Sequence, residues 1–65
     1  MENSEILNNI IKIQNSSARN YFESKERFFL INISDKIENN IDMKLSDEEI
    51  SFLGKIFKKY LKFAS

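Results

Sequence analysis

SDEEISFLGKIFKKYLKF, residues Ser46–Phe63, is the stretch that decides the fold class of this chain. Ser46 and Glu49 have the spacing of a capping box, in which each side chain accepts a hydrogen bond from the other residue's backbone N–H. Acidic residues fill the first turn and lysines occupy the last turns, which suits the positive and negative ends of a helix dipole. The stretch therefore predicts a capped helix over 46–63.

The apolar residues of this predicted helix recur at helical spacing. With residues placed about 100° apart, they share one side, Phe52 and Phe63 lie at its edge, and lysines lie opposite. The apolar arc covers about 180°, wider than the stripe of about 100° that a surface helix needs, so we expect its edge to contact a partner. Gly54 is either a tolerated weak point or a place of close helix approach. The apolar side holds Ile50, Leu53, Ile56, Phe57, Tyr60, Leu61 and Ala64.

The middle of the chain, residues 17–40, also predicts a helix with one apolar face. Tyr21, Phe28 and Ile31 lie off that face. A packed three-helix core of this size leaves little room for such off-face aromatics, which makes them candidates for an exposed patch. The face itself holds Ala18, Phe22, Phe29, Leu30, Ile33, Ile37 and Ile41.

Two alternatives remain open for this middle segment. Asn20 and Glu23 form a second, weaker capping pattern, from which the helix would begin later than residue 17. Residues 28–33 have the β-branched and aromatic content that strands favour. We favour a helix, because one strand without a partner strand cannot make a sheet.

The first segment, residues 4–15, carries apolar residues at helical spacing whose face lies about 130° away from the middle one. A break at Asn15-Ser16-Ser17 resolves this mismatch and predicts an all-α, three-helix bundle. Its helices would span about 4–15, 17–40 and 46–63, within a single domain over residues 1–65. The alternative is one long helix followed by a short C-terminal helix, which would need to oligomerise.

Composition narrows the classes of function. Ten basic and ten acidic residues cancel, and the chain of 65 residues has no Cys and no His. These counts exclude disulfides and Cys–His or Ser–His catalysis, and they leave no thiolate or imidazole metal ligand. We therefore predict no enzyme activity, cofactor or metal, and the adjacent carboxylates Asp47, Glu48 and Glu49 are explained as helix N-terminal charges. No stretch is long and apolar enough to span a bilayer, and we expect a cytoplasmic protein.

A chain this short has a marginal core of its own, so stabilisation by a partner chain or by oligomerisation is expected. We predict a small helical protein-binding module that acts by occupying a surface, as an inhibitor or adaptor of a larger protein, and that self-associates. A phage or mobile-element protein would fit this size. The predicted partner-binding residues are Tyr21, Phe28, Phe52, Ile56 and Phe63.

The alternative function is a regulatory protein that binds nucleic acid through one face of the C-terminal helix. Lysines on that face could neutralise phosphates or contact an acidic partner. The balanced net charge does not favour this alternative, since nucleic-acid binders usually carry a basic surplus. The lysines concerned are Lys55, Lys58, Lys59 and Lys62.

Overall fold

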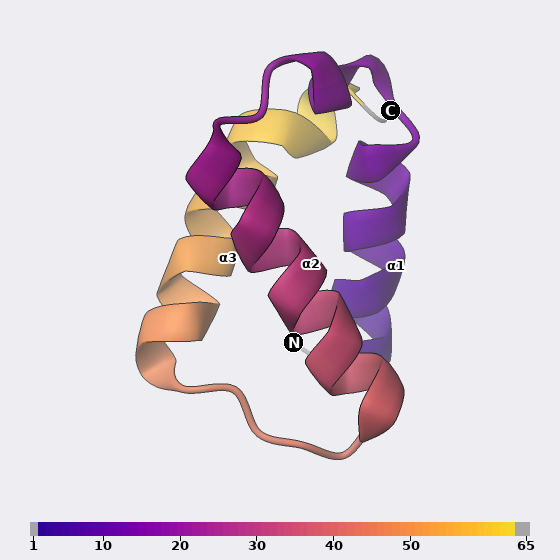
Figure 1. Cartoon of the computed structure of the whole chain (residues 1–65), viewed down its shortest axis with the longest axis vertical. Coiled ribbons are helices and arrows are strands. Elements are labelled where there is room, and N and C mark those ends of the chain that lie inside the picture. Colours follow the sequence, from indigo (N-terminus) through magenta and orange to yellow (C-terminus); the bar gives the residue numbers. More distant parts are fainter. Residues whose placement is uncertain (1, 64–65) are drawn as a thin grey trace.

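Three α-helices form the structure, a computed structural model in which residues 2–63 are described (Figure 1). The described residues contain no strand, so the predicted all-α three-helix fold is confirmed and the strand considered for 28–33 is wrong. α2 runs antiparallel to α1 and α3, and both 3₁₀ turns lie at one end, at the top of Figure 1. The elements are α1 (Asn3–Gln14), η1 (Ser17–Asn20), α2 (Ser24–Asn39), α3 (Asp47–Tyr60) and η2 (Leu61–Phe63).

The predicted break after the first helix is confirmed, and the single long helix is wrong. α1 ends at Gln14, and Asn15 takes the C-cap position. The Ser16 hydroxyl donates to the carbonyl oxygen of Ile13 at 2.8 Å and accepts from the backbone N–H of Ala18 at 3.1 Å. This one side chain thus satisfies backbone groups on both sides of the turn, which ends α1 and starts η1.

The second helix begins seven residues later than the main prediction of 17–40. η1 occupies the first part of that range, and α2 starts at Ser24 with Glu23 as its N-cap. The Glu26 carboxylate accepts a hydrogen bond from the backbone N–H of Glu23 at 2.9 Å. The helix does start later, as one of the two alternatives had it, but at a different cap: Asn20 lies in η1, and Glu23 and Glu26 form the capping box.

The third helix follows its prediction closely. The Ser46 hydroxyl accepts from the Glu49 backbone N–H at 3.2 Å, and the Glu49 carboxylate accepts from the Ser46 N–H at 2.9 Å. The α-helix ends at Tyr60, and the predicted last three residues form η2 instead. Gly54 is exposed, and a Cβ added there would meet no atom within 4 Å, so this glycine is a weak point and no site of close approach.

All three helices and η1 contribute to one hydrophobic core. This shared core explains the wide apolar arc of α3, because the buried residues of α3 belong to one cluster with buried residues of α1 and α2. Two residues predicted on apolar faces depart from the prediction: Ile50 is 50% exposed and Ile41 is similarly exposed. Ala64, also predicted on the α3 face, lies outside the described residues. The buried apolar side chains are Ile6, Ile10, Ile13, Ala18, Leu30, Ile33, Ile37, Leu53, Ile56, Phe57 and Tyr60.

Candidate functional site

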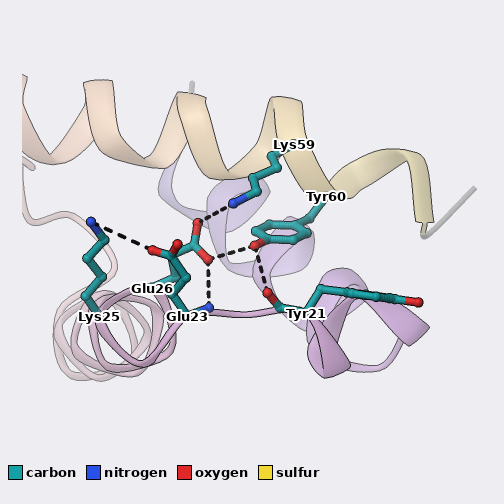
Figure 2. Close-up of polar contacts among 6 residues, drawn as sticks. All are labelled: Tyr21, Glu23, Lys25, Glu26, Lys59 and Tyr60. Atoms are coloured by element: carbon teal, nitrogen blue, oxygen red, sulfur yellow. Dashed lines mark hydrogen bonds and ion pairs between the residues drawn. The ribbon is translucent and has the colours of Figure 1, made fainter.

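A buried polar contact ties α2 to α3 below the end of the bundle where η1 and η2 meet (Figure 2). The Tyr60 hydroxyl donates to Glu26 Oε1 at 2.7 Å and lies 3.2 Å from the carbonyl oxygen of Tyr21. Lys59 Nζ lies 3.5 Å from the other carboxylate oxygen of Glu26. Glu26 is the one buried charged residue within 2–63, and every polar atom of its carboxylate has a partner.

The pKa values of this cluster follow from its geometry. Burial raises the pKa of Glu26, but the hydrogen bonds from the Glu23 backbone and the Tyr60 hydroxyl, with the charge of Lys59, outweigh it and lower that pKa overall. Burial and the bond to Glu26 raise the pKa of Tyr60. Glu26 is therefore a charged carboxylate at neutral pH, and Tyr60 is its neutral donor.

The same cluster positions two exposed aromatic rings, Tyr21 and Phe63, which we call the aromatic end. Their ring centroids lie 5.5 Å apart with the planes 21° from parallel, although the residues are 42 positions apart in the chain. Tyr21 is 64% exposed and Phe63 is 39% exposed. Figure 2 shows the Tyr21 ring extending away from the polar network. The network contacts only the backbone carbonyl of Tyr21, through the Tyr60 hydroxyl.

The other predicted partner-binding residues do not join the aromatic end. Ile56 is 1% exposed and belongs to the core, so its place in the predicted surface is wrong. Phe52 is half-buried and packs on Phe29, with ring centroids 4.5 Å apart. Phe28, 66% exposed on α2, carries no ring contact within residues 2–63. The structure thus keeps three of the five predicted residues on the surface and brings two of them together.

The lysine face of α3 is exposed as predicted, but its four lysines differ in the contacts they make. Lys55, Lys58 and Lys62 follow one another at spacings of three and four residues and are exposed. Lys62 Nζ lies 5.6 Å from the centroid of the Phe63 ring, so this lysine borders the aromatic end. Lys59 pairs with Glu26 and lies over the Tyr60 ring, so its charge interacts with groups of the chain itself.

Sequence reasoning missed the partnership of Glu26 and Tyr60. One signal was present, because a tyrosine on a buried helix face needs a partner for its hydroxyl. The spacing of Glu23 and Glu26 is also that of a capping box, but glutamate is not among the preferred N-cap residues, and the sequence pointed to Asn20 and Glu23 instead. The pairing itself depends on how α2 and α3 cross, and that is a tertiary property.

A hollow lies at the end of the bundle opposite the aromatic end, where the loop 40–46 passes α1. It has a volume of about 280 Å³ and is lined mainly by apolar side chains from α1, the loop and α3. The Asn3 side-chain amide fixes this loop by donating to the carbonyl oxygens of Ile41 and Met43. The lining residues are Asn3, Ile6, Met43, Lys44, Leu45, Ile50 and Leu53.

The described part of the chain shows no arrangement typical of a metal centre. No three Asp or Glu side chains within 2–63 lie close enough together to hold an ion. None of the helices there has the length and apolarity to cross a membrane. Comparisons with protein-family models, with curated proteins and with solved structures found no match.

Proposed function

We propose that this chain is a protein-binding module that acts by occupying a surface of a larger protein through its aromatic end. The observation that carries the proposal is the stacked, exposed pair of Tyr21 and Phe63. Tyrosine is among the residues that most often dominate the energy of protein interfaces. An exposed pair of rings from distant parts of the chain offers contact area that a single scattered aromatic does not.

Preorganisation adds to this argument. The Tyr60 hydroxyl contacts the Tyr21 carbonyl at 3.2 Å, and the Phe63 ring also lies 6.5 Å from the buried Tyr60 ring. Tyr60 thereby fixes the backbone of Tyr21 and contacts the ring of Phe63, and the Tyr21 ring in turn stacks on Phe63 before any partner arrives. Side chains that are already ordered lose less conformational entropy on binding, so more of their contact energy remains as affinity.

Self-association is part of the same proposal. A second copy presents the same aromatic end, so a symmetric contact between two such ends is expected at high concentration. This contact and partner binding would use the same rings and compete with each other. Sedimentation velocity over micromolar to millimolar concentration is expected to show a reversible dimer, and the double variant Tyr21→Ser/Phe63→Ser is expected to sediment as a monomer.

Quantitative capture from a lysate of the native cell tests the proposal. The wild-type chain and Ile41→Ser are expected to retain the same protein, whereas Tyr21→Ser/Phe63→Ser is expected to lose it. Ile41 is the matched control, because it is an exposed apolar residue of the loop 40–46. Figure 1 shows this loop at the end of the bundle opposite the two 3₁₀ turns. Equal recovery with all three chains, or recovery with none, would contradict the proposal.

The lysine face supports a second candidate, a nucleic-acid-binding protein. Its specific observation is the exposed row Lys55, Lys58 and Lys62 along one side of α3. If these lysines contact phosphates, log Kd should change with log salt by about 0.9 per contact on duplex DNA. Substituting all three with Gln should then reduce that slope, and unchanged binding in the triple variant would exclude this candidate.

A further inference from the structure

We infer that a depression between α1, η1 and α2 binds the carboxylate groups of an acidic peptide segment. The depression has a volume of about 410 Å³ and is open to solvent. It gathers both arginines of the chain, although they come from different elements and the chain otherwise uses lysine for its basic residues. We call it the arginine depression, and it is lined by Gln14, Arg19, Asn20, Phe22, Arg27 and Ile31.

The arginines of this depression are available to a ligand. No acidic residue lines it. Neither Arg19 nor Arg27 forms an ion pair or a side-chain hydrogen bond within residues 2–63, whereas Lys25, Lys36 and Lys59 each pair with a glutamate. A guanidinium group presents several N–H donors in one plane, which matches the two oxygens of a carboxylate.

The other residues that line the depression favour a ligand with more than an anionic group. The amides of Gln14 and Asn20 add neutral donors, while half-buried Phe22 and half-exposed Ile31 add apolar surface. A charged group bound beside apolar side chains is less exposed to water, so its hydrogen bonds are electrostatically stronger. This combination fits an acidic side chain whose neighbour in the partner is apolar.

The openness of the depression favours a peptide over a small molecule. Small-molecule sites usually enclose most of their ligand, which this hollow does not do. The balanced net charge argues against a polyanion, because no basic surplus steers one to this face. The site shares no residue with the aromatic end, so this inference stands independently of the proposed function.

A titration of the ¹⁵N-labelled full chain tests the inference without any variant. The probe is a capped peptide in which two glutamates flank a phenylalanine, and the matched probe carries glutamines in place of the glutamates. The Nε–Hε resonances of Arg19 and Arg27 are expected to shift and saturate with the glutamate peptide. The glutamine peptide should bind at least about tenfold more weakly, since it lacks the charge-assisted hydrogen bonds.

Variants then assign the binding to the depression. Arg19→Gln/Arg27→Gln should weaken glutamate-peptide binding at least about tenfold. Lys12→Gln is the control, because it removes one charge from α1 at an exposed position about 200° around the helix from Gln14, on the side away from the depression. It should change the Kd of the glutamate peptide less than about twofold. Tyr21→Ser/Phe63→Ser should leave this binding unchanged, which separates it from the proposed function.

Three results would overturn the inference. One is the absence of any shift at both arginine side chains. Another is a loss of affinity in Lys12→Gln as large as in the arginine double variant, which would indicate unspecific charge attraction. The third is tighter binding of inorganic phosphate than of the glutamate peptide, which would assign the depression to phosphate groups.

Discussion

The Tyr60 hydroxyl lies 2.7 Å from Glu26 Oε1, and both side chains are buried. This bond joins α2 to α3 across 34 positions of the chain, and its Tyr60 also contacts both residues of the aromatic end. A buried carboxylate is stable only when its oxygens are bonded. Tyr60 satisfies one oxygen of Glu26 and at the same time contacts the carbonyl of Tyr21. The stability of the fold and the placement of the aromatic end are therefore expected to depend on the same residue.

The substitution Tyr60→Phe isolates that hydroxyl. It leaves the ring in the core but removes one donor to the buried carboxylate, so we expect a loss of about 1–3 kcal/mol in the free energy of unfolding. Urea unfolding followed by circular dichroism measures it. The matched control is Tyr21→Phe, whose hydroxyl points away from the network (Figure 2) and whose effect should stay within about 0.5 kcal/mol. Equal effects of the two substitutions would contradict the role given to Tyr60.

Acid pH should destabilise the protein through the same carboxylate. The pKa of Glu26 in the folded chain lies below its ordinary value of 4.5, so its contribution is complete above that value and is lost as the pH falls through the folded pKa. The pKa of Glu49 is lowered in the same direction, first by the hydrogen bond from the Ser46 backbone. We therefore expect the free energy of unfolding to fall between about pH 5 and pH 2.

Glu26→Gln should make this decline shallower, because it removes one group that must take up a proton. Urea midpoints measured across that pH range give the slope. Glu38→Gln is the control, since Glu38 is exposed and forms no ion pair within residues 2–63. A decline as steep in Glu26→Gln as in Glu38→Gln would show that Glu26 does not govern acid stability.

Gly54→Ala should stabilise the protein. The position lies inside α3, and nothing within 4 Å obstructs a new Cβ. Alanine favours a helix interior over glycine by about 1 kcal/mol, which corresponds to a rise in Tm of about 4–8 °C for a domain of this size. Thermal unfolding measures the shift. A fall in Tm would mean that a neighbouring group approaches this backbone more closely than the structure shows.

The cap of α3 offers a further test. Ser46→Ala removes the acceptor of the Glu49 backbone N–H, and we expect a loss of about 1 kcal/mol in the free energy of unfolding. Ser51→Ala makes the same change at an exposed position inside α3, where alanine is the better helix former, and should cause no loss. A smaller loss for Ser46→Ala than for Ser51→Ala would refute the capping assignment.

Local signals predicted most of the fold. The reciprocal cap of Ser46 and Glu49, and the polar turn at 15–17, each satisfy backbone groups through neighbours in the chain, so sequence spacing was sufficient. The start of α2 was predicted too early, at residue 17 or after a cap at Asn20, because its actual cap, Glu23, is not a preferred N-cap residue. The end of α3 tightens into a 3₁₀ turn where it packs at the end of the bundle, and spacing alone carries no sign of that change.

The surface was harder to predict than the fold. Helical spacing placed Phe28 away from the core correctly, because Phe28 lies on α2 and its exposure follows from its angle around that helix. Tyr21 is exposed as well, but it follows η1 in the turn before α2, so the helical angle predicted its exposure for the wrong reason. It could not show that Tyr21 stacks on Phe63, since that contact depends on the meeting of η1 and η2. Ile56 shows the opposite error, in which a residue of a wide apolar arc was assigned to a partner although it is buried in the hydrophobic core of the chain itself.

Site-specific photo-crosslinking is the direct test of protein binding through the aromatic end. The chain would carry p-benzoyl-phenylalanine at position 21 and, in a control, at position 41, and each form would be irradiated in a lysate of the native cell. We expect a discrete adduct from position 21, with the mass of this chain plus one partner, that position 41 does not form. No adduct from position 21, or the same adducts from both positions, would contradict this proposal.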